Sequence, residues 1–270
     1  MTPAALARRV WPSSPRRSAA VLVVTLSFAI IFPAGTARAF DDSALIQGFL
    51  VTVFGAEVGD GDDGTASSVV KKFTGPVTYR ILSTASVNHT KTLRDFLGQL
   101  ADTVQNLRFV ELMAPAQAQI MIYLVDRHEY VPTIRATVWD GVDTAFLEAN
   151  ACSAVLAARR SGIERANIYL VADEGFVGLA HCMVEEIAQS LGPANDNNLL
   201  THSIFNDASS INVFGLFDWY ILNMLYDVRI RPGMRAEEVL PILPSVIADV
   251  RRLLPHALAK SQAFARHVGR

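Results

Sequence analysis

Residues 180–196 read A-H-C-M-V-E-E-I-A-Q-S-L-G-P-A-N-D, and this stretch decides how the rest of the chain is arranged. Its apolar residues recur at steps of three and four, which is the spacing of one buried face of an α-helix. They are Ala180, Met183, Val184, Ile187, Ala188 and Leu191. The pattern predicts a helix that ends at Gly192-Pro193, because glycine caps helix C-termini and proline cannot continue a helix.

The other side of the predicted helix is polar. It carries a line of residues four apart, a second glutamate beside them and an Asn-Asp turn after the helix: His181, Glu185, Gln189, Glu186, Asn195 and Asp196. A carboxylate pair on a mostly buried helix predicts an active site or a ligand-binding site. In the structural alternative, Glu185 and Gln189 hydrogen-bond the loop after the helix, and the Asn-Asp pair caps a turn.

The first 39 residues have the three parts of a secretory signal peptide. Four arginines come first, an uncharged apolar run occupies residues 19–32, and Ala37-Arg38-Ala39 follows. The run is shorter than the ~20 residues that a membrane-spanning helix needs. We therefore expect cleavage after Ala39 by general secretion, with twin-arginine export at Arg16-Arg17 and an uncleaved anchor as the alternatives. No cysteine follows the run, which argues against a lipoprotein.

Charge excludes one class of partner. The full chain has a net charge of −2, and residues 1–39 contain five arginines and no acid, so the mature protein carries −7. Such a protein has no electrostatic reason to bind nucleic acid. We expect it to be periplasmic or secreted, without stable membrane insertion after cleavage, and to bind a peptide or another envelope component.

Two cysteines are present, Cys152 and Cys182. In an oxidising compartment they are expected to form one disulfide, which would tie the motif helix to the segment near residue 150. The alternative is that Cys182 acts as a nucleophile beside His181. Adjacent helical residues point about 100° apart, so this pair would not face each other.

The remaining pattern is that of one α/β (α+β) domain. Apolar, partly β-branched runs predict strands at residues 77–82, 120–125 and 166–171, with a weaker edge strand at 133–138. Helical spacing is found at 40–58, 92–107, 216–226 and 236–265, and prolines at 241 and 244 predict a kink or split in the last helix. The Gly- and Asp-rich residues 59–68 are interpreted as a linker, because no glutamate stands where an EF-hand needs one. The expected architecture is a mixed twisted sheet, a motif helix after the last strand and a helical C-terminal part.

This order and the motif resemble the metzincin branch of zinc metallopeptidases, whose signature is H-E-x-x-H-x-x-G-x-x-H/D. In this sequence Glu185 stands at the first histidine and Glu186 at the catalytic glutamate. Gln189 stands at the second histidine, Gly192 at the glycine and Asn195 at the third ligand. The resemblance implies a single zincin-like domain at residues 69–270, preceded by a signal peptide at 1–39 and a helix with an acidic linker at 40–68. Residues 218–226 are similar to the C-terminal helix of matrixin-like peptidases, and residues 203–205 stand at the methionine turn without its methionine.

The departures from that signature concern the metal. Both helical histidines are replaced, and catalytic zinc sites hold at least one imidazole as a rule, so zinc is not expected. The oxygen set of Glu185, Gln189, Asn195 and Asp196 would suit calcium, magnesium or manganese. Either His181 or His202 is a candidate substitute imidazole, although a lone histidine is more often a surface or hydrogen-bonded residue.

A closer resemblance is to a family of exported proteobacterial proteins of unassigned activity, domain of unknown function 2927. Its pattern is C-x-x-E-E-x-x-Q-x-L-G-x-x-N-D, followed by D…L-Y-D-x-R-x-x-P-G-M. The matching residues are Cys182, Glu185, Glu186, Gln189, Leu191, Gly192, Asn195, Asp196, Asp218, Leu225, Tyr226, Asp227, Arg229, Pro232, Gly233 and Met234. The resemblance implies a zincin-like fold and a shared site, but no substrate.

Three functions remain open at this point. The first is a zincin-like module that has lost its zinc ligands and serves in binding or structure. The second is a hydrolase with an oxygen-ligated metal, in which Glu186 is the general base. The third is a metal-free hydrolase of envelope glycans that uses Asp196 with Glu185 or Glu186.

Overall fold

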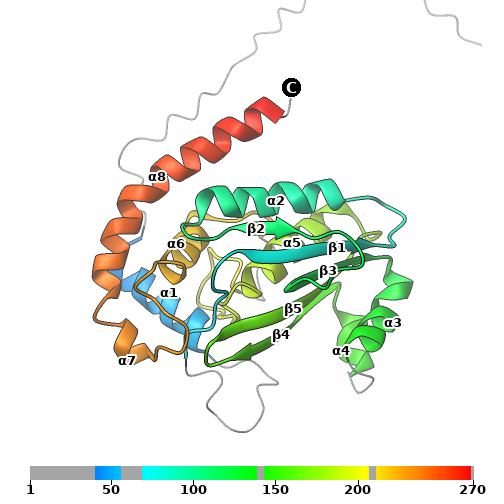
Figure 1. The fold of residues 1–270 in the computed structure, drawn as a ribbon, viewed down its shortest axis with the longest axis horizontal. Helices are drawn as coiled ribbons and strands as arrows, with labels where there is room; N and C mark the ends of the chain where they lie inside the picture. Colours follow the sequence, from blue (N-terminus) through cyan, green and yellow to red (C-terminus); the bar gives the residue numbers. More distant parts are fainter. Residues whose placement is uncertain (1–39, 56–68, 139–142, 207–210, 269–270) are drawn as a thin grey trace, which may run out of the picture. The chain divides into compact units, whose positions relative to one another are not determined.

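A five-stranded sheet forms the centre of the computed structural model, which describes residues 40–55, 69–138, 143–206 and 211–268 (Figure 1). The strand order is β2-β1-β3-β5-β4. The strands are β1 (Val77–Ser83), β2 (Phe109–Glu111), β3 (Ile120–Val125), β4 (Cys152–Arg159) and β5 (Gly162–Val171). The strands β2, β1, β3 and β5 run parallel to one another, and β4 pairs antiparallel with β5. The two edge strands of the sheet are β2 and β4. This mixed sheet confirms the expected α/β class.

Both faces of the sheet are covered. Side chains alternate between the faces along each strand, so Ile122 and Ile168 enter the main core whereas Val125 and Tyr169 enter a second, smaller core. The smaller core is closed by α3 (Arg127–Thr137) and α4 (Thr144–Ala149), which lie at the end of the sheet where β3 and β5 finish (Figure 1). Burial on both faces explains why β3 and the last four residues of β5, 168–171, are apolar.

The main core is closed by the remaining helices. They are α1 (Asp42–Phe54), α2 (Thr90–Thr103), α5 (Phe176–Gln189), α6 (Leu216–Leu225), α7 (Ala236–Val239) and α8 (Leu243–Val268). The motif helix α5 follows β5 directly, as predicted, and its last residue lies three positions before Gly192. Nine of the ten residues of α6 are buried, so this helix is apolar nearly all round and lies at the centre of the helical part (Figure 1).

An extended segment at residues 69–73, called the strap below, joins three distant parts of the chain. Val70 N donates to Met234 O at 2.8 Å, and Ile163 N at the start of β5 donates to Lys72 O at 3.1 Å. At the end of the motif helix, Gly192 has a φ of +135°, and a Cβ there would lie 2.2 Å from Lys71 O. Only glycine permits this approach, so the turn that ends the motif is shaped by contact with the strap.

Lys72 is the buried cation of the strap. Its ammonium donates to Leu225 O at 2.8 Å and to Asp227 O at 3.1 Å, and it lies 5.4 Å from the centroid of the Tyr226 ring. Leu225 is the last residue of α6 and Asp227 follows two positions later, so the ammonium lies at the C-terminal end of the helix, where a positive charge also favours the helix dipole. Burial lowers the pKa of Lys72 to about 8, although the charge of Asp227 opposes this shift.

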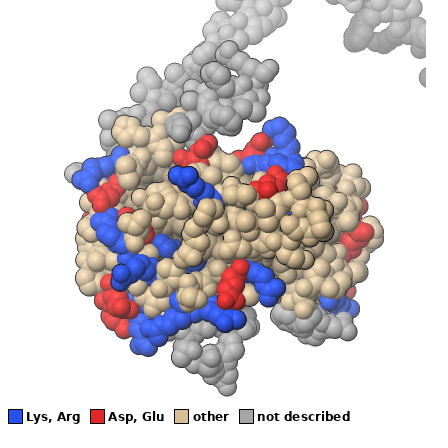
Figure 2. Space-filling model, in the orientation of Figure 1, with Lys and Arg blue, Asp and Glu red and all other residues tan. Residues whose placement is uncertain are grey.

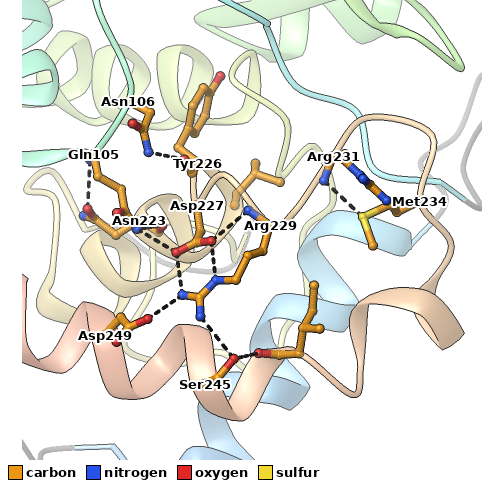
Figure 3. A network of polar contacts seen from close by, with 12 residues as sticks. Gln105, Asn106, Asn223, Tyr226, Asp227, Arg229, Arg231, Met234, Ser245 and Asp249 are labelled. Carbon is orange, nitrogen blue, oxygen red and sulfur yellow. Dashed lines mark hydrogen bonds and ion pairs between the residues drawn. The ribbon is translucent and has the colours of Figure 1, made fainter.

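Polar contacts continue from the end of α6 into α8 and α2 (Figure 3). Arg229 forms ion pairs with Asp227 at 2.8 Å and with Asp249 of α8 at 2.7 Å. Asn223 accepts from Gln105 N at 3.0 Å, just after α2. The second stretch of the family pattern therefore contributes a network that holds three helices together.

Several details differ from the sequence prediction. The predicted edge strand at residues 133–138 is wrong: it lies mostly in α3, where Tyr130 and Ile134 are one helical turn apart and both buried in the smaller core. The edge strand β4 was not predicted. Its side chains show no alternation between buried and exposed positions, because all but the last are half-buried. The predicted split of the C-terminal helix is confirmed by α7 and α8. The predicted linker at 59–68 and the signal peptide lie outside the described residues, and the proposed division into segments remains a prediction.

In the described part of the chain, no helix combines the length and the apolar character that crossing a membrane requires.

We expect Lys72→Met to lower the free energy of unfolding by about 2–4 kcal/mol, because two buried carbonyls at the end of α6 lose their donor. Chemical denaturation measures the change. The matched control is Lys91→Met. The Lys91 side chain is 74% exposed and paired with Asp95 on α2, so this change should alter stability by less than about 0.5 kcal/mol. Equal stability of the two variants would contradict the role assigned to Lys72.

Candidate functional site

The candidate site is the polar line along α5. His181, Glu185 and Gln189 lie on successive turns of one helix, and all three are half-buried. The opposite side of the helix is held against the main core by residues such as Met183 and Ile187. The apolar spacing of the sequence therefore places the polar residues where the prediction expects them.

His181 and Glu185 form an ion pair, with 3.1 Å between Nε2 and Oε2. The other ring nitrogen, Nδ1, lies 2.6 Å from the carbonyl oxygen of Ile211. Both nitrogens face acceptors, so both carry protons and the ring is an imidazolium. The hydrogen bond to Glu185 is the main cause that raises the pKa of His181 to about 9, and Asp196 adds a smaller contribution of the same sign, while burial opposes both.

Gln189 pairs with the loop that follows the helix. Its Nε2 donates to Asp196 Oδ2 at 2.6 Å. The polar line thus consists of two interacting pairs, His181 with Glu185 and Gln189 with Asp196. The structure brings these four predicted residues together.

Asn195 is directed elsewhere. It is buried, and its Nδ2 donates to Thr52 O at 2.9 Å, while its backbone N donates to the same oxygen at 3.2 Å. The Asn195 amide therefore ties the loop to the C-terminal part of α1. No pattern in the sequence connects Thr52 with the motif, because the two are 143 positions apart.

Glu186 lies on a different side of α5 from Glu185, as expected for neighbours on a helix. Its side chain is buried, with only 8% of the residue exposed. The charge of Glu186 adds to the burial that raises the pKa of Tyr130 to about 12, and the Tyr130 hydroxyl lies 3.0 Å from Ser153 Oγ on β4. The candidate general base therefore lies in the interior rather than on the polar line.

Cys182 on α5 forms a disulfide with Cys152 at the start of β4, with 5.7 Å between the Cα atoms. The predicted pairing is confirmed, and the alternative of a nucleophilic Cys182 is wrong because neither cysteine is free. The bond fixes the motif helix against the edge strand of the sheet.

His202 is separate from the polar line. Its ring stacks on Phe40 with 4.8 Å between centroids and meets Phe217 edge-on at 4.7 Å. Burial lowers the pKa of His202, which favours a neutral ring in an aromatic cluster. His202 is an exposed residue, so this placement agrees with the surface role expected of a lone histidine.

The turn at residues 203–205, which stands at the methionine turn of the resemblance, is buried and held by an acid. Ser203 Oγ donates to Asp218 Oδ1 at 2.6 Å, and Gly215 N donates to Asp218 Oδ2 at 2.8 Å. Burial raises the pKa of Asp218 to about 6, although these hydrogen bonds oppose the shift. Asp218 thus connects the turn to the first turn of α6.

Within the part of the chain that the structure describes, no three side chains of His, Cys, Asp or Glu are grouped as a metal site. Three residues on the polar line are of metal-ligating types: His181, Glu185 and Asp196. In the arrangement observed, the imidazolium is a hydrogen-bond donor and has no lone pair for a metal.

The family comparison agrees with the second resemblance. The sequence model of the family described as "Protein of unknown function (DUF2927)" matches residues 42–245. This chain belongs to the DUF2927 family. No curated protein matches it.

The matched region of the DUF2927 domain runs from the first residue of α1 to the beginning of α8. It therefore includes the strap, the complete polar line of α5 and the network at the end of α6 except Asp249, which lies four residues beyond the match. The carbonyl of Ile211, which fixes the imidazolium, was not identified from the sequence, because a backbone acceptor has no residue-type signature.

The ion pair predicts a pH dependence of stability. The pKa of His181 is raised from 6.5 to about 9, so its contribution is complete below pH 6.5 and is lost as the pH rises towards 9. We expect the wild type to lose about 1 kcal/mol more than His181→Gln over this interval, after allowance for the partial exposure of the pair. Urea unfolding at a series of pH values measures this difference.

The control is His202→Gln, which should keep the wild-type pH dependence between pH 6.5 and 9, because the lowered pKa of His202 places its titration below this interval. Parallel curves for the wild type and His181→Gln would show that the imidazolium adds nothing to stability.

Proposed function

We propose that this protein is exported to the periplasm or beyond, and that its DUF2927 domain is a zincin-like module that binds a peptide or another envelope component without hydrolysing it. The observation that carries the proposal is the pairing along α5: His181 with Glu185 at 3.1 Å, and Gln189 with Asp196 at 2.6 Å. The three positions that hold metal in the metzincin signature are here Glu185, Gln189 and Asn195, and each has another partner: His181, Asp196 and the Thr52 carbonyl.

The topology supports the zincin-like part of the proposal. The resemblance expects a strand, a helix, further strands and then the motif helix after the last strand. The observed order has β1, α2, β3 and β5 in that succession, and α5 follows β5 at once. The motif glycine, Gly192, ends the helical region with a positive φ and turns the chain into the segment that carries Asn195 and Asp196.

The side-chain chemistry favours binding over hydrolysis. A water-activating zinc needs neutral nitrogen or thiolate ligands, and an imidazolium that donates two hydrogen bonds supplies none. Glu186, at the position of the catalytic glutamate, is buried and influences Tyr130 across the interior. On the polar line, Glu185 is paired with His181 within α5, and Gln189 joins the helix to the following loop through Asp196.

A peptide partner is favoured by the edge of the sheet. β4 pairs only with β5 among the strands of the described residues, so its outer edge has backbone donors and acceptors in the direction of a further strand. An extended peptide can add to such an edge by main-chain hydrogen bonds. The disulfide between Cys152 and Cys182 holds this edge rigidly next to α5.

Export is supported by two independent features. The first is the leader pattern in residues 1–39, and the second is the disulfide, since such bonds persist mainly in oxidising compartments.

The proposal is tested by metal binding to the native protein and to a variant that restores the imidazoles. Elemental analysis of the purified wild type should find no stoichiometric zinc, calcium or manganese. The double change Glu185→His and Gln189→His should create a zinc site, because i and i+4 histidines converge and Asp196 lies beside the second one. Isothermal titration calorimetry measures the affinity.

The matched control places the same histidine pair on an exposed helix, by Lys91→His and Asp95→His on α2. We expect the α5 variant to bind zinc at least about tenfold more tightly, because only α5 offers a third ligand. Equal affinities would contradict the zincin-like placement. A stoichiometric metal in the wild type that disappears in Glu185→Ala would support the oxygen-ligated hydrolase instead.

A further inference from the structure

A shallow hollow of about 490 Å³ lies where the turn between β4 and β5 meets the loop before α7. It is separate in sequence from the polar line of α5 and shares no residue with it. The residues that line it are Arg160, Ser161, Arg231, Pro232, Gly233, Met234 and Glu238. Figure 2 shows Lys and Arg side chains gathered at the lower left of the visible face, the region in which Figure 1 places α7 and the β4–β5 turn.

The backbone around the hollow is held in place by the strap. Gly233 N donates to Val70 O at 2.9 Å, and Gly233 has a φ of +81°. A Cβ at this position would lie 2.8 Å from Arg160 O, so the close approach of the two segments requires glycine. Within the loop, Arg231 N lies 3.1 Å from Met234 Sδ, as Figure 3 shows. The two arginines are thus presented from two segments whose relative position is fixed.

Both guanidinium groups are available to a ligand. Arg160 and Arg231 are half-exposed or exposed, and in the described residues neither guanidinium has a carboxylate within ion-pair distance. Their neighbours differ: Arg159 pairs with Glu164 at 2.9 Å and Arg229 pairs with two aspartates. The one acid of the lining, Glu238, accepts from the backbone N of Arg235 at 2.8 Å.

The chemistry of the lining points to an oxyanion. Two guanidinium forks match the oxygens of a phosphate by paired hydrogen bonds, and the Ser161 hydroxyl adds a donor. The volume is within the range of small-molecule sites and exceeds what one phosphate fills. Pro232 and Met234 add apolar lining beside the arginines. The net charge of the chain is −2, so this local positive pair is not part of a general attraction for anions.

We propose that this hollow binds a phosphate group carried on a larger molecule, with Arg160 and Arg231 as its two principal contacts. The carrier is a soluble phosphate ester or the headgroup of a lipid, since both present the same terminal oxygens. The site does not rest on the function proposed for α5, and either can fail alone.

The test uses the purified full chain and three probes at constant ionic strength: glycerol 3-phosphate, glycerate, and phosphatidylcholine vesicles with or without phosphatidic acid. Calorimetry measures the soluble probes and co-sedimentation measures the vesicles. The Arg160→Ala, Arg231→Ala double variant should bind the phosphate-bearing probes at least about tenfold more weakly than the wild type. Arg165→Ala, which removes an exposed arginine of β5 outside the hollow, should bind as the wild type does.

A second variant, Arg160→Lys with Arg231→Lys, keeps both charges but loses the paired geometry, and should bind with intermediate affinity. It also separates loss of a contact from loss of folding, which circular dichroism checks for every variant. Binding of glycerol 3-phosphate supports the soluble source, and binding only to vesicles with phosphatidic acid supports the lipid source.

Three results would overturn the site: no binding of any phosphate probe, binding of glycerate as tight as that of glycerol 3-phosphate, or equal weakening by Arg165→Ala and the double variant.

Discussion

The contact between Lys72 and the end of α6 is the constraint on which the rest of the structure depends. A buried ammonium binds the last carbonyl of α6 and the carbonyl of Asp227 just after it, and the strap that carries it also bonds to the start of β5 and to the loop at Gly233. The same segment lies against Gly192, where the motif turns away from α5. One extended stretch therefore fixes the sheet, the end of the motif helix and the position of the arginine-lined hollow.

The motif helix has different side-chain chemistry from the metzincin signature that its sequence resembles. Glu185 and Gln189, at the two histidine positions, lie one helical turn apart, but Glu185 pairs with His181, and Gln189 holds the loop after the helix through Asp196. Asn195 is turned towards Thr52 and contributes to the attachment of α1. These contacts stabilise the helix and its loop without a metal, and the disulfide sets the distance to the edge strand. A rigid edge beside a locked helix is suited to holding a partner.

Sequence periodicity was sufficient where burial follows a regular spacing. It predicted α5, β3 and β5, because each has an apolar face or an uninterrupted apolar run, and two cysteines allowed only one pairing. It failed at α3, where β-branched residues resemble a strand and the tertiary position of Tyr130 decides otherwise. It also did not reveal that Glu186 is buried or that the Ile211 carbonyl meets His181, since both depend on packing between distant segments. The hollow at Arg160 and Arg231 was not predicted for the same reason, because 70 residues lie between these two arginines in the sequence.

The most direct test of the account is the NMR titration of the His181 imidazole, alone and with added zinc, calcium or manganese. If His181 and Glu185 form a stable ion pair that excludes metal, the pKa of His181 lies near 9 and does not change when any of these ions is added. A pKa near the ordinary 6.5, or one that falls sharply when an ion is added, would contradict the account. It would mean that the imidazole can bind metal and that the residues of the polar line are metal ligands.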